Sequence, residues 1–350
     1  MNALHRNLSG VILFAGLASA AAAQTVTFAG WGGVTQEAER KAYFEAGAKA
    51  LGMTIREDSH NGYASIKAQV ESGAKAWDVV GSGIADCVRA AKAGLTQPLD
   101  YKVIKTDGLP KEFVQPNCVG LWTFSYGIAY RTDTYKAGGP KSWADFWDVK
   151  KFPGRRSLGV ISGGRYLMES ALVADGVAPA DVYKVLTGPG GVDRAIKKLE
   201  AIKPAIAVWW TSQGQAMQLL KDKEVDMMIL ANGRAQALID EKVPVAFEFN
   251  GAVLDIEMFF VLKGAANPAN AMRLIDYSLR PEPQAAFTKY IPYGPTNPKA
   301  YQTGIIPKDK LAILPTAPDN LKRQSILSAE FYASPEGEAA LARITRLTQN

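Results

Sequence analysis

Histidine and cysteine are nearly absent from this sequence of 350 residues, which contains two of each. His5 lies near the N-terminus, so only His60 could act as the base of a catalytic triad, and its polar surroundings are typical of a surface loop. Two cysteines and one histidine cannot build a Cys/His zinc site. The motifs G-x-S-x-G, Walker A and H-E-x-x-H are missing. These absences favour a binding protein over an enzyme, and we expect neither a metal ion nor a cofactor.

Long apolar runs are missing too, because no segment approaches the ~20 uninterrupted apolar residues that cross a bilayer. The N-terminal residues have a weakly basic start with His5 and Arg6, an apolar run from Leu8 to Leu17, and small residues ending at Ala23. This layout predicts a cleavable secretory signal peptide over residues 1–23. No cysteine follows the apolar run, so we expect no lipid anchor.

Neither sign of charge dominates, since 40 Lys and Arg residues stand against 34 Asp and Glu residues and the formal net charge is +6. Loss of Arg6 with the signal peptide would lower it to +5. The cations are scattered among the acids, so we expect no nucleic-acid partner. A positive chain also repels cationic ligands at long range, so a site for a cation must hold it with local carboxylates.

The two cysteines, Cys87 and Cys118, can pair with no thiol left over once the chain is exported to an oxidising compartment. The alternative is two buried thiols that never meet. We expect the disulfide, because closing a loop of about thirty residues contributes a few kcal/mol to stability.

The order of apolar runs and helical patterns predicts an α/β protein with two lobes. Strands alternate with helices in two series, as in parallel βαβ units. The strands are expected at Val26–Trp31, Met53–Ser59 and Trp77–Ser82, then at Arg156–Ser162, Ala205–Trp210 and Val225–Asn232. A long β-rich run, Leu254–Gly264, follows the second series. It is either an edge strand or the chain crossing back between the lobes.

Ligands of open α/β sheets bind at the carboxyl ends of the strands, which here lead into four loops. These are Gly30–Gly33, Gly81–Gly83, Ser162–Arg165 and Trp209–Ser212. Trp209 and Trp210 are adjacent in a predicted strand, so they point to opposite faces. We expect one of them to pack in the lobe and the other to form an aromatic wall of the cleft, with Ser212 capping the next helix.

Four segments, WDVVGSG, KSWADFWD, VDMMILANGRA and IPYGPTNPKA, resemble periplasmic solute-binding proteins of the spermidine/putrescine family. The similarity covers nearly the whole mature chain in the same order. It implies a type II periplasmic-binding-protein fold, two hinged lobes that each contain a mixed sheet flanked by helices. It also implies a monomer in the periplasm that has no enzymatic activity and delivers a small amine to an ABC transporter permease in the inner membrane.

The lobe boundaries that we expect use both halves of the chain. Lobe 1 combines residues 24–129 with 255–300, and lobe 2 combines 130–254 with 301–350. An exported two-lobed enzyme is the alternative from another class of protein, since this fold also occurs in enzymes.

The resemblance also suggests site residues. Trp31 stands where the family has a cleft aromatic, Ser82 in the serine-bearing loop, and Tyr293 at a cleft tyrosine. Glu257 stands at the acid that grips an amine, whereas Asp255, two residues earlier, replaces an aromatic. Ala231 replaces a family tryptophan.

The largest departure from the family is the loop before residue 167, where polyamine receptors carry carboxylates. This chain has Arg165 and Tyr166 instead. A guanidinium at a helix start suits a carboxylate, so one hypothesis is a 4-aminobutyrate-like ligand with its amine at Asp255 or Glu257 and its acid at Arg165. The other is that Arg165 points to solvent and the ligand is a plain diamine such as putrescine, or spermidine.

Overall fold

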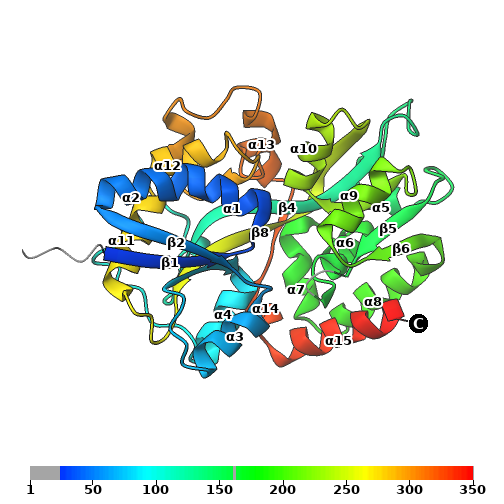
Figure 1. The fold of residues 1–350 in the computed structure, drawn as a ribbon. Coiled ribbons are helices and arrows are strands. Elements are labelled where there is room, and N and C mark those ends of the chain that lie inside the picture. The colour runs from blue at the N-terminus through cyan, green and yellow to red at the C-terminus, as the bar shows by residue number, and fades with distance from the viewer. Residues whose placement is uncertain (1–23, 161–162, 350) are drawn as a thin grey trace, which may run out of the picture.

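Two long strands, β4 (Cys118–Arg131) and β8 (Val245–Val261), run antiparallel through the centre of the molecule and connect its two lobes (Figure 1). The computed structural model describes residues 24–160 and 163–349. The sheet order is β2-β1-β3-β8-β4-β7-β5-β6, so each lobe is built on one end of a continuous sheet. The predicted signal peptide, residues 1–23, and Ser162 lie outside the described residues.

The first lobe is built on three parallel strands, as the βαβ pattern predicts. Strand β1 (Gln24–Gly30) pairs with β2 (Met53–Ser59) on one side and β3 (Val79–Gly83) on the other. The helices of this lobe are α1 (Gly33–Glu39), α2 (Glu45–Leu51), α3 (Tyr63–Glu71), α4 (Ile84–Lys92), α11 (Pro268–Ser278) and α12 (Pro281–Phe287). A π-helical segment, Arg40–Phe44, joins α1 to α2.

The second lobe repeats this arrangement. Strand β5 (Arg156–Gly159) pairs in parallel with β6 (Ile206–Trp210) and β7 (Met227–Ala231). Its helices are α5 (Trp143–Trp147), α6 (Leu167–Ala174), α7 (Val182–Leu186), α8 (Gly191–Ile202), α9 (Gln213–Lys221) and α10 (Asn232–Asp240). The predicted two-lobed α/β fold is confirmed, although the two sheets are joined edge to edge through β8 and β4.

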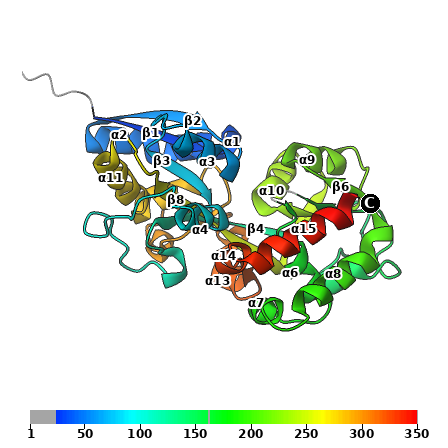
Figure 2. The ribbon, with the colours of Figure 1, turned by 90° about the horizontal axis from the view of Figure 1, so that it is seen from below.

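The C-terminal segment returns from one lobe to the other. Its elements are β9 (Gly294–Pro295), α13 (Pro318–Leu321), β10 (Ser325–Ile326), α14 (Ala329–Tyr332) and α15 (Pro335–Gln349), and short 3-10 turns occur at Lys111–Phe113, Pro179–Asp181, Lys203–Ala205, Pro298–Gln302 and Leu311–Ile313. Figure 2 shows α15 lying along the second lobe. We keep the lobe boundaries as a proposal with one change. Residues 301–317 go to lobe 1, because Ala317 and its neighbours share an apolar cluster with Ala285 of α12.

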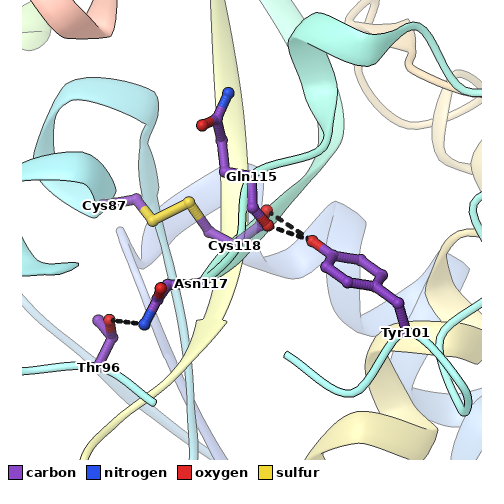
Figure 3. Close-up of a disulfide and its surroundings, with 6 residues drawn as sticks. All are labelled: Cys87, Thr96, Tyr101, Gln115, Asn117 and Cys118. Carbon is purple, nitrogen blue, oxygen red and sulfur yellow. Dashed lines mark hydrogen bonds between the residues drawn. A yellow bond between two sulfur atoms is a disulfide. The ribbon is translucent and has the colours of Figure 1, made fainter. Parts of the chain in front are cut away.

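The predicted disulfide is present and joins Cys87 of α4 to Cys118 at the start of β4 (Figure 3). The two residues are 31 apart in sequence, and such a loop contributes roughly 3–4 kcal/mol in the chain-entropy model. Nearby, the hydroxyl of Tyr101 donates to the carbonyls of Gln115 and Cys118. The disulfide ties α4 to the central strand, and both elements supply cavity residues.

None of the helices in the described part of the chain combines the length and apolar character needed to cross a membrane. Within residues 24–160 and 163–349, no three His, Cys, Asp or Glu side chains gather in a way that could hold a metal ion.

Candidate ligand-binding site

A cavity of about 280 Å³ lies between the lobes, beside the central strands β4 and β8. Its lining residues are Trp31, Thr35, Gly83, Asp86, Trp122, Phe124, Tyr126, Arg165, Tyr166, Gln213, Ala231, Arg234, Asp255, Glu257 and Tyr293. This volume is at the lower end of the roughly 300–1,000 Å³ of drug-sized ligand sites, so the cavity suits a small ligand. A larger surface hollow of about 510 Å³ lies beside α8 and α14, but it lacks this combination of both charges with several aromatic rings.

Two buried carboxylates lie at one end of the cavity, Glu257, which lines it, and Glu39, which lies behind it; we call this the acidic end. Glu257 on β8 is 2% exposed and accepts a hydrogen bond of 2.8 Å from the indole Nε1 of Trp31. Glu39, at the end of α1, accepts one of 3.0 Å from the indole of Trp122. Trp122 and Glu257 are paired residues of β4 and β8. Both carboxylates therefore lie beside Trp122.

Burial makes both of these carboxylates weak acids. Desolvation raises the pKa of Glu39 to about 8, partly offset by the hydrogen bond from Trp122. Desolvation likewise raises the pKa of Glu257 well above its usual range, and the nearby Glu39 raises it further. In the described part of the chain neither carboxylate forms an ion pair. A cation that entered here would therefore find two unpaired acids.

The other two carboxylates of the cavity, Asp86 and Asp255, have partners within the protein, in a cluster with Arg165 and Tyr166 that we call the lobe junction. The guanidinium of Arg165 in the second lobe contacts Asp86 of α4 in the first lobe at 2.9 Å. The hydroxyl of Tyr166 donates to Asp255 Oδ2 at 2.8 Å. Burial raises the pKa of Asp255 only to about 6, because Arg165 and Tyr166 oppose the effect of desolvation. This cluster links the two lobes.

Stacked aromatic pairs form the walls between these two charged clusters. The rings of Trp122 and Tyr293 stack at 4.8 Å, and those of Tyr126 and Tyr166 stack at 4.0 Å. Gln213, the first residue of α9, donates to the hydroxyl of Tyr126. Aromatic faces attract alkylammonium groups and exclude water from the methylene part of a ligand.

A second cation of the cavity, Arg234, has no carboxylate partner in the described part of the chain. It lies in the first turn of α10, where the helix dipole disfavours a cation and favours an anion. Its neighbour Asn232 is held by hydrogen bonds to Ser125 N and Pro292 O, so the start of the helix is fixed beside β4. The guanidinium and the helix start together suit a ligand carboxylate.

Six of the residues suggested by the sequence line this cavity: Trp31, Arg165, Tyr166, Asp255, Glu257 and Tyr293. Ser82 is fully buried behind it and donates to Asp86 Oδ2, so it positions that carboxylate. Ser212 does not line it either, but caps α9 by accepting from Gln215 N, as predicted.

The prediction that Trp209 or Trp210 forms a wall of the cleft is wrong for this cavity, because neither lines it. Trp210 is fully buried against Gly159, and Trp209 packs half-buried against the core of the second lobe. The reason is strand order: β6 is the outermost strand of its lobe, far from the central strands.

The prediction that His60 lies on a surface loop is also wrong. Its ring is 4% exposed, its Nδ1 accepts from Gly62 N–H, and its Nε2 lies 2.8 Å from the carbonyl of Gly81. These partners fix a neutral ring that donates from Nε2, and burial lowers its pKa. His60 therefore braces two loops of the first lobe.

Five lining residues were not predicted from the sequence: Asp86, Trp122, Tyr126, Gln213 and Arg234. Arg234 gave a usable signal, since it lies within the segment ANGR between a strand and a helix. The position of Trp122 and Tyr126 depends on β4, a strand that was not predicted.

Two α/β lobes with a small, charged and aromatic cavity between them define a receptor that encloses a small solute. The model of the family described as bacterial extracellular solute-binding protein matches residues 40–315. The chain belongs to this family, whose members bind a solute for an ABC transporter and are not enzymes.

Named relatives divide between two kinds of solute. The chain is 38% identical to the gamma-aminobutyric acid-binding protein of Pseudomonas aeruginosa, over 91% of this chain and 90% of that protein. It is 27% identical to spermidine/putrescine-binding periplasmic protein 1 of Haemophilus influenzae, over 76% of this chain and 72% of that protein. The polyamine protein is thus the more distant of the two.

Solved structures support the same fold. An ABC transporter substrate-binding protein from Bradyrhizobium japonicum is 41% identical, with a TM-score of 0.88 over 93% of this chain and 99% of that one. The periplasmic binding protein MotA from A. tumefaciens B6, in complex with glucopine, is 36% identical, with a TM-score of 0.84 over the same shares of the two chains.

Proposed function

We propose that this protein captures a small amino acid with separated charges, such as 4-aminobutyrate, in the cavity between its lobes. It is exported to the periplasm by a signal peptide over residues 1–23 and delivers the solute to an ABC permease in the inner membrane. The ligand ammonium lies at the acidic end beside Glu257, and the ligand carboxylate lies at Arg234.

The observation that carries this proposal is the unpaired Arg234 in the same cavity as Glu257 and Asp255. Arg165 pairs with Asp86 and Tyr166 donates to Asp255, so Glu257 and Arg234 remain to be matched. A ligand with one ammonium and one carboxylate pairs a charge at each end. A diamine would place its second ammonium near Arg234, where like charges repel.

This reading changes the role expected of Arg165. The guanidinium was a candidate for holding the ligand carboxylate, but one of its nitrogens already donates a hydrogen bond to Asp86. Arg234 is the better candidate, because the ligand would be its first anionic partner. A zwitterion also removes the difficulty that a positive chain repels a cationic ligand, since its net charge is zero.

Similarity to known receptors supports an amino acid rather than a polyamine as the ligand. The relative at 38% identity carries the name of a gamma-aminobutyric acid receptor, and the polyamine relative is at 27%. The structure with glucopine raises an opine as a second candidate. The cavity of about 280 Å³ favours the smaller ligand.

A thermal-shift and calorimetric panel tests the proposal with 4-aminobutyrate, glucopine, putrescine, spermidine and butyrate. We expect 4-aminobutyrate to raise the melting temperature and to bind at one site, and butyrate, which lacks the ammonium, to do neither. The variant Arg234→Gln should weaken binding of 4-aminobutyrate by about 100-fold. Stabilisation by putrescine but not by 4-aminobutyrate would overturn the proposal.

A further inference from the structure

Arg165, the cation of the lobe junction, uses only part of its guanidinium. One terminal nitrogen donates to Asp86 Oδ1 at 2.9 Å. Its Nε is buried and has no hydrogen-bond partner within residues 24–160 and 163–349. A buried donor without an acceptor costs roughly 1–3 kcal/mol, so such a group calls for an explanation. A second position of the side chain, in which Nε finds an acceptor, supplies one.

The carboxylates near Arg165 differ in whether they have an oxygen to spare. Asp86 Oδ1 accepts from Arg165, and its Oδ2 accepts from a serine hydroxyl. Asp255 Oδ2 accepts from the hydroxyl of Tyr166, and its Oδ1 accepts from a backbone N–H. Neither of these two acids therefore has an unused oxygen for the Nε of Arg165.

Glu169, in the first turn of α6 and four residues after Arg165, does have an unused oxygen. The side chain is fully buried, and the hydroxyls of Tyr183 and Tyr332 both donate to Oε1. Its Oε2 is buried and has no partner among the described residues. Burial raises the pKa of Glu169, and the two tyrosine hydroxyls and the charge of Arg165 oppose that effect. A buried acceptor without a donor thus accompanies a buried donor without an acceptor.

Tyr332 of α14 contacts both of these side chains. The guanidinium of Arg165 lies over its ring, 5.9 Å from the ring centroid, and its hydroxyl lies 2.7 Å from Glu169 Oε1. The backbone just before Arg165 is tightly packed, because a Cβ on Gly164 would collide with Ile344 of α15. A change of partner therefore falls to the long, rotatable side chain of the arginine.

We propose that Glu169 is the resting partner of Arg165: when the lobes separate, the guanidinium leaves Asp86 and turns onto Glu169 Oε2 within its own lobe. Without such a partner, opening would leave a largely buried cation unpaired, which is costly. Closure of the lobes is then an exchange of one ion pair for another. Glu169 does not line the cavity, so it is a positioning residue that sets how much of the empty receptor is closed.

The exchange predicts opposite effects for two acids that serve the same arginine. Loss of Asp86 removes the partner across the cleft and favours the open form. Loss of Glu169 removes the partner within the second lobe and favours the closed form. Because the apparent affinity is proportional to the fraction of receptor that is competent to bind, loss of Glu169 should tighten ligand binding. A merely structural role of this buried acid could only weaken it.

The closed fraction can be measured in the full chain without ligand by double electron–electron resonance. Spin labels at Lys67→Cys in α3 and Lys197→Cys in α8 report the distance between the lobes, since both lysines are exposed and the helices lie in different lobes (Figure 1). The native Cys87 and Cys118 are bonded to each other and stay unlabelled. The wild type should show an open and a closed population.

The variant Glu169→Gln keeps Oε1 for the two tyrosine hydroxyls and removes the charge. We expect the closed fraction to rise about threefold and 4-aminobutyrate to bind about threefold more tightly. Asp175→Asn is the matched control, because Asp175 follows the same helix and pairs with Arg194 inside the second lobe. This control should leave the closed fraction unchanged.

A second background shows whether the effect acts through the arginine. With Arg165→Gln neither acid has a guanidinium to hold, so adding Glu169→Gln should no longer change the closed fraction. Glu169→Asp serves if Glu169→Gln does not fold, since it withdraws the charge from the guanidinium and should also raise the closed fraction.

The two arms separate this inference from the proposed function, on which only the affinity measurement rests. A closed fraction that is unchanged or lower in Glu169→Gln, or one that rises equally in the Arg165→Gln background, would overturn the exchange of partners. Failure of the wild type to bind 4-aminobutyrate would overturn the proposed function alone, because the distance measurement needs no ligand.

Discussion

The acidic end and the lobe junction are both built from buried carboxylates, but they differ in what neutralises them. At the lobe junction the protein supplies Arg165 and the hydroxyl of Tyr166. At the acidic end, the described residues supply two indole N–H groups and no cation to Glu39 and Glu257. The difference teaches how one residue type serves two purposes. Carboxylates that the protein neutralises connect the lobes, and those left without a cation are available to a ligand.

The largest effect should come from neutralising the acid that meets the ligand. The substitution Glu257→Gln preserves the shape of the side chain and removes its charge, so the ligand ammonium loses its principal partner. We expect 4-aminobutyrate to bind at least about 100-fold more weakly, or about 3 kcal/mol, in calorimetry. Glu248→Gln is the control on the same strand, since Glu248 pairs with Arg323 away from the cavity. Equal losses of affinity in Glu257→Gln and Glu248→Gln would show that Glu257 is not the acid that holds the ligand ammonium.

The stability of the unliganded protein should depend on pH through the acidic end. Because burial raises the pKa of Glu39 to about 8, the folded protein binds more protons than the unfolded chain. Folding stability is then fully present below the unfolded pKa and falls as pH rises toward 8. Between pH 6 and 8 we expect Glu39 to contribute a loss of about 2 kcal/mol, measured by chemical denaturation, and Glu257, whose pKa is raised too, to add to it.

The variant Glu39→Gln should make that profile less steep, with the contribution of Glu257 remaining. The difference between the two proteins isolates Glu39 from His60, whose lowered pKa acts in the opposite direction below its ordinary value of 6.5. If the free energy of unfolding of the wild type rises from pH 6 to 8, the acidic end does not contain buried carboxyls with raised pKa values.

A smaller effect should follow from breaking the lobe junction. The substitution Asp86→Asn removes the contact of Arg165 across the cleft and should favour the open form. We expect about tenfold weaker binding, since the closed state is less populated, and a larger radius of gyration in X-ray scattering without ligand. Asp193→Asn is the control, because Asp193 pairs with Arg343 within the second lobe. An unchanged radius in Asp86→Asn would show that the ion pair does not govern closure.

The smallest effect should come from the indole that donates to Glu257. Trp31 is 44% exposed, so water can replace its N–H when it is changed to Phe. We expect about fivefold weaker binding with little change in stability. Trp147→Phe, which removes a donor to the carbonyl of Lys198, should leave the affinity unchanged. A loss as large as that of Glu257→Gln would mean that Trp31, rather than the carboxylate, holds the ligand.

Much of the fold could be predicted from the sequence, because periodicity reports which face of an element is buried. The strand Met53–Ser59 was predicted with its observed bounds. Strand β4 was missed. It is buried along nearly its whole length and contains Gly120, Thr123 and Ser125, so neither alternation nor a continuous apolar run marks it.

The site could be predicted only in part. Trp31, Asp255, Glu257 and Tyr293 were found through the resemblance to a family. The tryptophan pair of β6 was misplaced, because adjacent side chains reveal opposite faces but not the position of the strand in the sheet.

The sequence by itself determined the class of the protein, through its two α/β series and the four segments that resemble a family, and it offered two cysteines that could pair. Only the tertiary structure decided which charges are paired. Arg165 and Asp86 are 79 residues apart, and Glu39 and Trp122 are 83 apart. Such pairings depend on how β4 and β8 bring the lobes together, and a local pattern of residues carries no information about a partner so distant. Whether a buried carboxylate joins the lobes or awaits a ligand is therefore a property of the folded protein.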